Sequence, residues 1–478
     1  MITTRAKYYL ARLRAARASG TLRTRVGRKV KGTFYVPSLV LWKYLVLNQA
    51  DRKLRIATGL ADHRRPGSAP SASDRGIAER ICAAYRAAKL DEPKATKPYQ
   101  VRGLWAEMIK VNYGPLIEAV TRSDIESLCR LLDNFSREQF AVGTGAGYDD
   151  YVHYQTPLLG GLYIKAVWCE YRDALVESGF DLSKIRFPSV GNPFGVPLNG
   201  DIIQIETLRH ALYAARISRL LSDQDSPVAV EIGGGFGGQA FQVVTQCRES
   251  GRPVGKYLDY DIPEVQIVAS YFLLKALPDE VVRLYGEECN TNDFTIGVFP
   301  HYAIESLGDL SADLVFNSHS FSEMTSDASR NYLSVCNRIC RKYFLHVNHE
   351  TRFAYKEADG TVTRNLLGSQ MVPDPGLFKH IYRFPRVVQR PEDRFDTSFE
   401  YLYERRRGTC HLRETPVSEA CPAVCRRPAS GSMARSSQPE RELSFTDARG
   451  RCPIASEGEI GSAARLRTYF RGRLSVKR

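Results

Sequence analysis

Residues 228–239, VAVEIGGGFGGQ, join a short apolar run to a loop with five glycines in six positions. The apolar run predicts a buried strand, and the residues after Gln239 carry the apolar spacing of a helix. Glycine is needed where the backbone takes a positive φ, or where a bound molecule must approach the main chain closely. The stretch therefore predicts a strand–loop–helix unit that forms a ligand site at the carboxyl end of a strand.

The glycine spacing fits two classes of cofactor. Gly233, Gly235 and Gly238 form the G-x-G-x-x-G pattern of dinucleotide sites. Gly237 completes a second pattern, acid-x-G-x-G-x-G, in which Glu231 is the acid and the ligand is S-adenosylmethionine. A carboxylate in a strand that is covered on both faces is costly unless a positive group pairs with it, and S-adenosylmethionine carries an ammonium and a sulfonium. Glu231 therefore favours S-adenosylmethionine; the alternative is a carboxylate that accepts backbone N–H groups and shapes the loop.

A second acidic position supports a nucleoside ligand without choosing its class. The next apolar run ends in YLDYDIPEV (257–265), about twenty residues beyond the loop. A carboxylate at this distance accepts the two ribose hydroxyls in either cofactor class. We take Asp261, directly before Ile-Pro, as the ribose ligand and Asp259 as the weaker candidate.

After residue 226 short apolar runs alternate with helical patterns. This alternation predicts an α/β fold with a mainly parallel sheet. Two later runs, near 380–389 and 397–404, predict an antiparallel hairpin at the sheet edge. The strands expected in the parallel part are 227–232, 255–260, 281–285, 312–317 and 342–348.

The same reading divides the chain into four parts. Residues 1–75 read as a basic arm followed by a linker rich in Ser, Pro, Ala and Arg, and residues 76–215 as a mainly helical region that shapes the acceptor site or forms its lid. Residues 216–407 form the expected cofactor-binding domain. Residues 408–478 are rich in Ser, Pro, Gly and Arg without periodicity, which predicts a disordered basic tail.

The net charge of +14 resides at the two ends of the chain. Residues 1–32 carry +10 and residues 405–478 carry +9, which leaves the body at −5. Basic ends suit nucleic acid or an anionic membrane, but solvated arms are the interpretation that we favour.

Other whole-chain features predict a cytoplasmic protein. The most apolar early stretch, residues 34–47, is too short to span a bilayer and contains Lys43. The eleven cysteines are scattered without a C-x-x-C pair, so free thiols in a reducing compartment are expected.

Two motifs together, the acid–glycine loop and D-I-P-E-V, resemble class I S-adenosylmethionine-dependent O-methyltransferases. Three further segments are similar to a family of sugar O-methyltransferases from bacterial secondary-metabolite and glycan pathways: GNPFG (191–195), DLVFNSHSFSEM (313–324) and FEYLYERR (399–406). The resemblance covers about half of the chain, roughly 150–406. It implies a Rossmann-like class I methyltransferase sheet, S-adenosylmethionine as the cofactor, and methyl transfer to a sugar hydroxyl of a glycoside, glycan or nucleotide sugar.

The segment NSHSFSEM supplies the expected catalytic groups. A sugar hydroxyl is a very weak acid, so its methylation needs a general base or a metal. His319 is the expected base, because neutral imidazole is available at pH 7. Glu323, four residues on, would orient it if a helix begins there, and Asn317 would bond the cofactor's amino-acid part or the substrate.

Two more histidines are weaker candidates for substrate contacts. His349 follows the fifth predicted strand, and His210 lies on the helix before the glycine loop, where core packing is its alternative role. No metal ligands are assigned, although related sugar methyltransferases sometimes use magnesium.

Three other function classes stay open. The glycines and Asp261 would also serve an NAD(P)-dependent oxidoreductase, against which Glu231 and NSHSFSEM argue. The basic ends and N-P-F at 192–194 suit a nucleic-acid methyltransferase, but the fourth strand ends in N-S-H-S instead of the Asn/Asp-Pro-Pro-aromatic segment that base-amine methylation uses. The third class is a non-catalytic interaction protein.

Overall fold

The computed structural model describes residues 69–141, 162–198, 201–288, 294–357, 360–386 and 398–406. The chain divides into two units, Met1–Thr409 and Cys410–Arg478, and every described residue belongs to the first. The predicted basic arm up to residue 68 and the predicted tail 408–478 therefore lie outside the described residues.

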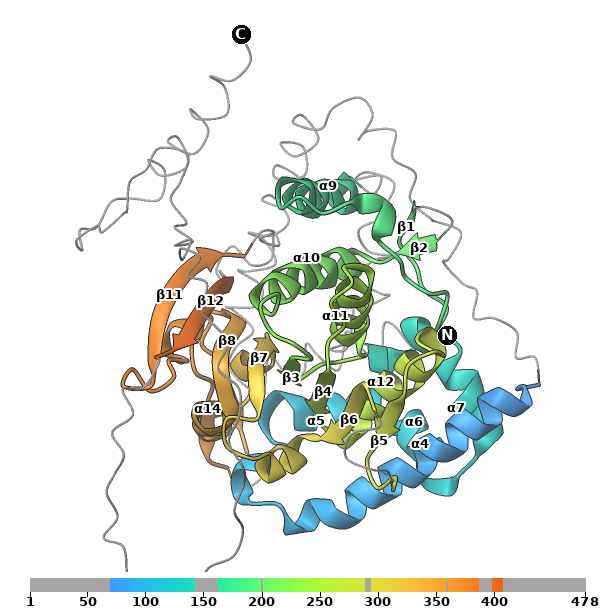
Figure 1. Cartoon of the computed structure of the whole chain (residues 1–478). Helices are drawn as coiled ribbons and strands as arrows, with labels where there is room; N and C mark the ends of the chain where they lie inside the picture. Colours follow the sequence, from blue (N-terminus) through green and yellow to red (C-terminus); the bar gives the residue numbers. More distant parts are fainter. Residues whose placement is uncertain are drawn as a thin grey trace, which may run out of the picture. The chain divides into compact units, whose positions relative to one another are not determined.

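The described unit contains α-helices, short 3-10 helices and strands (Figure 1). The α-helices are α4 (Ala72–Asp91), α5 (Gly103–Asn112), α6 (Gly114–Arg122), α7 (Ile125–Leu132), α9 (Leu162–Glu177), α10 (Ile205–Leu220), α11 (Gly238–Glu249), α12 (Pro263–Ala276), α13 (Ser320–Glu323) and α14 (Ser326–Ile339). The 3-10 helices are η1 (Glu92–Lys94), η2 (Lys97–Tyr99), η3 (Phe135–Arg137), η4 (Gln139–Ala141), η5 (Leu182–Lys184), η6 (His301–Ser306) and η7 (Gly368–Gln370). The strands are β1 (Val196–Leu198), β2 (Asp201–Ile203), β3 (Val228–Ile232), β4 (Lys256–Asp261), β5 (Val282–Leu284), β6 (Ile296–Pro300), β7 (Ala312–Ser318), β8 (Cys340–His349), β9 (Ala354–Lys356), β10 (Val362–Arg364), β11 (Phe378–Pro385) and β12 (Ser398–Arg405).

An eight-stranded sheet organises this unit, in the order β11-β12-β8-β7-β3-β4-β6-β5. The strands from β8 to β5 in this order pair in parallel, whereas β12 runs antiparallel to β8 and pairs with β11 as a hairpin. The predicted fold class, a mainly parallel Rossmann-like sheet with an antiparallel hairpin at its edge, is confirmed. Parallel strands bring their carboxyl ends to one edge, so this topology gathers residues far apart in sequence along that edge.

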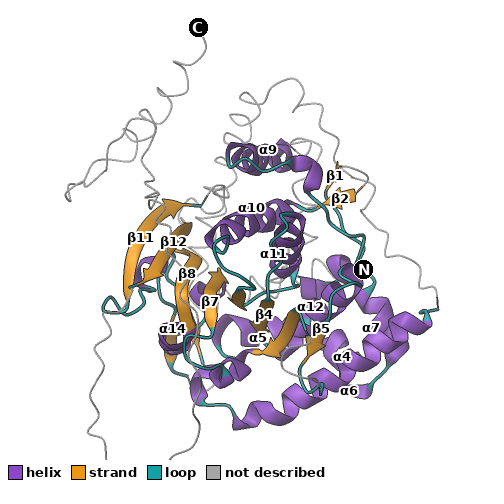
Figure 2. Cartoon of the chain, in the orientation of Figure 1, coloured by secondary structure: helices purple, strands orange, loops and turns teal. Residues whose placement is uncertain are grey.

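Helices cover both faces of the sheet (Figure 2). On one face α10, α11 and α12 pack in a row, and outer helices lie on them, α9 on α10 and α4 on α12. The other face contacts α14. Side chains alternate between the two faces along each strand: Ala229 and Tyr257 belong to the first apolar core, and Val230 and Leu258 to the second.

The first described helix begins inside the stretch that composition predicted to be a linker, residues 61–75. Ser71 caps α4, because its Oγ accepts the Asp74 amide at 3.1 Å while the Asp74 carboxylate accepts the Ser71 amide at 3.2 Å. This reciprocal pair satisfies two backbone donors that a helix start leaves open. Helix α4 therefore begins four residues before the helical region predicted from residue 76, and the linker before it stays a prediction.

The five predicted strands of the parallel part and the predicted hairpin are all present, with ends that differ by up to four residues. Among the described residues five strands were missed: β6 lies between β4 and β5 in the sheet, β1 and β2 form a small hairpin, and β9 and β10 form another. The predicted boundary between the helical region and the cofactor domain, at residue 216, falls within α10 and stays a prediction. Across the described part of the chain, no helix combines the length and hydropathy that a bilayer-spanning segment needs.

Candidate functional site

The glycine loop connects the carboxyl end of β3 to the start of α11, as predicted. Its backbone takes positive φ at alternate positions, with +79° at Gly233, +64° at Gly235 and +85° at Gly237. The amide of Gly233 donates to the carbonyl of Tyr260 at 2.7 Å, which ties the loop to the end of β4. A Cβ atom at Gly233 would also collide with the side chain of Ser320, so this position requires glycine for space as well as conformation.

Asp261 joins the two strand ends from the other side. Its carboxylate accepts the amide of Gly235 at 2.9 Å and the amide of Ile262 at 2.7 Å. Burial raises the pKa of Asp261 to about 7, against the effect of these two amides, which favour the ionised form. The predicted ribose ligand and the predicted cofactor loop are therefore in direct contact.

Two further acids lie in the same layer. Glu231 and Asp259 are opposite each other in the parallel register of β3 and β4, and Asp261 shares their face because side chains alternate along a strand. Glu231 is 2% exposed, and its carboxylate accepts the hydroxyl of Tyr257 at 2.7 Å. Burial raises the pKa of Glu231 to about 7, which the Tyr257 hydrogen bond opposes. Glu231 therefore faces a neighbouring strand's hydroxyl, a partner that the sequence did not suggest.

Asp259 is the least satisfied of the three acids. Its side chain is 0% exposed, and neither carboxyl oxygen has a hydrogen-bond partner among the described residues. Burial, followed by the charges of Glu231 and Asp261, raises its pKa well above the ordinary value. A Cβ atom at Gly234 would collide with this carboxyl group, so Asp259 lies directly beneath the loop. A buried polar group without a partner is rare in proteins and marks this layer as unusual.

Asn317, at the end of β7, is bonded within the protein. Its Nδ2 donates to the carbonyl of Ile232 at 2.8 Å and to the hydroxyl of Ser320 at 2.5 Å. Its Oδ1 accepts the side-chain amide of Asn348 at 2.8 Å. These bonds connect the ends of β3, β7 and β8, and they use both of the hydrogens on Nδ2. The predicted contact between Asn317 and a cofactor stays a prediction.

His319 directly follows β7 and adopts a backbone conformation that is rare for a residue with a side chain, with φ +67° and ψ −31°. Its amide donates to the carbonyl of Val347 at 2.7 Å, and its carbonyl accepts the Ser322 hydroxyl at 2.7 Å. The ring atom Nε2 lies 3.4 Å from Nη1 of Arg386. Such strain persists only where the surrounding structure holds it, and it is concentrated at functional sites.

Glu323 ends the four-residue helix α13 that begins after His319. Its carboxylate accepts the indole N–H of Trp105, on α5, at 3.0 Å. A contact from the helical region thus reaches the carboxyl edge of the sheet. The predicted pairing of Glu323 with His319 stays a prediction.

The two weaker histidine candidates differ in surroundings. His349 ends β8; its Nδ1 accepts the amide of Thr351 at 3.3 Å, and its ring lies 5.2 Å from that of Phe353. His210 lies on α10, where burial lowers its pKa to about 3 and Nδ1 has no hydrogen-bond partner among the described residues. A Cβ atom at Gly238 would lie 2.6 Å from that nitrogen, so the neutral ring of His210 packs against the start of α11.

Sequence reasoning did not identify four partners in this region: Trp105, Tyr257, Ser320 and Arg386. Tyr257 carried a usable signal, because it precedes Asp259 by two residues on a predicted strand and therefore shares its face. Ser320 lies within the motif NSHSFSEM but was given no role, and Trp105 and Arg386 come from distant segments without a motif of their own. In the described ranges, no group of three or more His, Cys, Asp or Glu side chains is arranged to hold a metal ion.

No family model and no curated protein matches this sequence. Among solved structures, the chain is similar to magnesium protoporphyrin IX methyltransferase from Synechocystis PCC 6803 with bound S-adenosylmethionine, at 14% identity and a TM-score of 0.28, over 50% of this chain and 97% of that one. It is also similar to 1,6-didemethyltoxoflavin-N1-methyltransferase from Burkholderia thailandensis with bound S-adenosylhomocysteine, at 14% identity and a TM-score of 0.27, over 41% of this chain and 78% of that one. A third similar structure is the [4+2]-cyclase SpnF, at 12% identity and a TM-score of 0.28, over 41% of this chain and 80% of that one. The fold class rests on the strand order and not on these likenesses.

Proposed function

We propose that this chain is an S-adenosylmethionine-dependent O-methyltransferase whose acceptor is a sugar hydroxyl. The observation that carries the proposal is the bond between Asp261 and the amide of Gly235, which unites the glycine loop with the acid predicted to bind ribose. When bound, S-adenosylmethionine supplies an electrophilic methyl group on a positively charged sulfur. The cofactor residues in this proposal are Glu231, Gly233, Gly235, Gly237, Asp261 and Asn317.

The residues at the ends of β3 and β4 fit such a group. The loop offers main chain without side chains, and three carboxyl groups lie beneath or beside it. Burial holds protons on carboxyl groups that would ionise in water, and a cationic ligand favours their ionised form. A ligand with two positive groups would therefore stabilise a layer that is poorly satisfied without it.

His319 is the proposed general base. A guanidinium can only donate hydrogen bonds, so the Arg386 contact requires an unprotonated Nε2. In our proposal the acceptor hydroxyl replaces Arg386 at Nε2, and this nitrogen takes the proton of the hydroxyl as the oxygen bonds to the methyl carbon and the bond between that carbon and sulfur breaks, which leaves S-adenosylhomocysteine. The strained backbone at His319 fixes the imidazole at the carboxyl edge of the sheet, beside the loop's contact residue Ser320.

The sugar class of the acceptor rests on the resemblance of residues 191–195, 313–324 and 399–406 to sugar O-methyltransferases. The contact between Trp105 and Glu323 is consistent with a helical region that contributes to the acceptor site. Indole rings and carboxylates are also side chains that suit the apolar faces and hydroxyl groups of sugars.

Calorimetry with S-adenosylmethionine and with NAD tests the cofactor, followed by a methyl-transfer screen against glycosides with mass detection. We expect binding of S-adenosylmethionine, no heat with NAD, and a mass gain of one methyl group on at least one glycoside. Binding of NAD alone would replace the proposal with an oxidoreductase. If neither S-adenosylmethionine nor NAD binds, the result would support a non-catalytic interaction protein. Methylation of nucleic acid but not of glycosides would support a nucleic-acid methyltransferase.

A further inference from the structure

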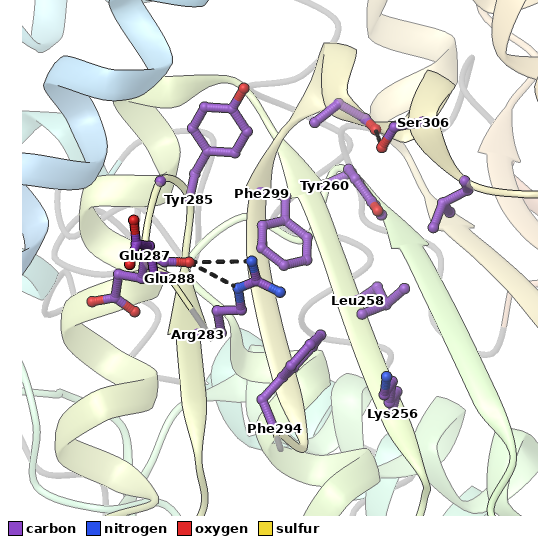
Figure 3. Close-up of a pocket in the computed structure, with 13 residues that line it drawn as sticks. Lys256, Leu258, Tyr260, Arg283, Tyr285, Glu287, Glu288, Phe294, Phe299 and Ser306 are labelled. Carbon is purple, nitrogen blue, oxygen red and sulfur yellow. Dashed lines mark hydrogen bonds between the residues drawn. The ribbon is translucent and has the colours of Figure 1, made fainter. Parts of the chain in front are cut away.

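A hollow of about 950 Å³ lies over the sheet beside the β5 edge (Figure 3). It is bordered by strand residues of β4, β5 and β6, by the turn after β5, and by the short helix η6. The residues that line it are Lys256, Leu258, Tyr260, Arg283, Tyr285, Gly286, Glu287, Glu288, Phe294, Phe299, Ala303, Ser306 and Leu307.

This hollow is separate from the layer of acids beside the glycine loop. Leu258 and Tyr260 alternate along β4 with Asp259 and Asp261, so the two sets point to opposite faces of the sheet. The core assignments agree, since Leu258 and Tyr260 belong to the second apolar core, whereas Tyr257 belongs to the first. A molecule in the hollow would therefore not touch a cofactor on the loop.

The walls of the hollow are aromatic. The rings of Phe294 and Phe299 meet edge to face at 6.1 Å, and the ring of Tyr260 lies 5.8 Å from that of Phe299. Leu258 and Phe294 are only 6% and 8% exposed, so the floor is apolar and closely packed. A flat apolar ring is the shape that such walls accept.

Two cations lie over these rings. Nζ of Lys256 is 4.8 Å from the centre of the Phe294 ring, and the guanidinium of Arg283 is 5.4 Å from the same ring and 5.9 Å from that of Phe299. Arg283 donates to the carbonyl of Glu287 through Nε and Nη2, at 3.3 and 3.1 Å. Figure 3 shows its third nitrogen pointing away from Glu287. No described residue accepts a hydrogen bond from that nitrogen, so Arg283 keeps donors for an anion.

The nearby acids offset the charge of Arg283 only in part. The carboxylate of Glu287 is bonded to Arg80 at 2.7 and 2.9 Å, and to the amide of Leu284 at 2.8 Å. The negative charge of Glu287 is therefore paired with Arg80, which does not line the hollow. Glu288 is exposed at the rim, where water and salt screen it.

We propose that this hollow is a second binding site, for a planar aromatic molecule that carries one carboxylate. The ring lies against Leu258, Phe294 and Phe299, and the carboxylate binds Arg283. The volume is within the range of small-molecule sites, and the combination of apolar walls with a few convergent polar groups is typical of them. The proposal is independent of the reaction proposed for the glycine loop.

Calorimetry of the full chain with 1-naphthoate tests this site, and 1-naphthylmethanol is the uncharged comparison. We expect submillimolar binding of 1-naphthoate and at least tenfold weaker binding of the alcohol, because a charged hydrogen bond is lost. Arg283→Gln should weaken 1-naphthoate about tenfold and leave the alcohol unchanged. Arg283→Lys, which keeps the charge, should recover part of the affinity.

Two controls make the test specific. Arg248→Gln changes an exposed arginine on α11 that pairs with Glu280 at 3.2 Å, and it should leave both affinities unchanged. Saturating S-adenosylhomocysteine should not displace 1-naphthoate, because the two sites lie on opposite faces of the sheet. The proposal would be overturned if S-adenosylhomocysteine displaced 1-naphthoate or if the alcohol bound as tightly as 1-naphthoate. An equal loss of 1-naphthoate affinity in Arg283→Gln and Arg248→Gln would overturn it as well. Absence of binding would overturn it too.

Discussion

At the ends of β3 and β4, three carboxyl groups share one buried layer, whereas at the ends of β7 and β8 the polar groups are amides and imidazoles. The acids have few partners: Glu231 accepts one hydroxyl, and Asp259 has no hydrogen bond among the described residues. At the other end, Asn317 makes three hydrogen bonds, and the strained backbone at His319 is held from both sides. The acids at the ends of β3 and β4 can therefore still gain partners from a ligand, whereas the polar groups at the ends of β7 and β8 are already held by hydrogen bonds within the protein.

Because of this difference, we expect binding and chemistry to depend on different residues. A layer of protonated acids gains most from a cationic ligand, so its variants should change affinity. A rigid, strained position fixes a reacting group, so its variants should change turnover. The four predictions below test this separation.

The largest effect is expected from Gly235→Val, at the acid end. A β-branched residue at φ +64° is strained by roughly 1–3 kcal/mol, and we expect its side chain to take space that the cofactor needs. Binding of S-adenosylmethionine should become undetectable by calorimetry, while urea unfolding stays cooperative. Gly308→Ala is the control, because its Cβ would meet open space. Retained affinity in Gly235→Val would show that the loop does not contact the cofactor.

His319→Ala should lower turnover by about 10²–10⁴-fold, the range for a lost general base, with cofactor affinity almost unchanged. His319→Gly also lacks the imidazole but tolerates the positive φ, so it should unfold at higher urea concentration than the alanine variant. Methyl transfer measured by mass, together with urea midpoints, checks both expectations. Equal turnover of His319→Ala and the parent would remove His319 as the base.

Asp261→Ala should weaken S-adenosylmethionine binding by about 1.5–3 kcal/mol, as for a lost charged hydrogen bond. The loop also loses its bond to the Gly235 amide, so Asp261→Asn, which keeps an acceptor oxygen, separates the two causes. The asparagine variant should hold the loop yet still bind the cofactor more weakly. If neither variant changes affinity, the acid end is not the ribose site.

The smallest effect is a pH dependence at the acid end. The folded-state pKa values of Glu231 and Asp261, about 7, lie above their ordinary values, so the folded protein binds more protons than the unfolded chain between about pH 4 and 7. The contribution of these two groups to the stability of the cofactor-free protein is therefore fully present below about pH 4 and is lost as pH rises through 7. Urea unfolding at pH 5, 6, 7 and 8 measures this slope. Glu231→Gln should flatten it; an unchanged slope would assign it to other groups.

Much of the acid end could be predicted from the sequence, because its information is local. The glycine loop follows an apolar run, and strand alternation places Glu231, Asp259 and Asp261 by counting. The pairing of Glu231 with the Tyr257 hydroxyl follows from the same alternation, once β3 and β4 are known to be neighbours. The order of the strands in the sheet could not be predicted, because no single segment of the sequence specifies it.

The imidazole end was predicted only in part. The motif at 317–323 indicated His319 and Glu323, yet their contacts come from Arg386, after β11, and from Trp105, on α5. Arg386 and Trp105 belong to no sequence motif. Contacts between residues far apart in the chain produce no periodic pattern in the sequence. The strand β6 was missed because Gly297 interrupts its apolar run and Pro300 ends it, and both residue types weaken a strand pattern.

The α/β class, the glycine loop, the position of the acid that follows it and the antiparallel hairpin could therefore be predicted from the sequence, since each depends on spacing within one segment. The tertiary structure alone decided that β6 enters the sheet beside β4, that Asp259 lies unpartnered beneath Gly234, and that Arg386 faces His319. These features depend on which distant segments pack together, and packing is a property of the whole chain.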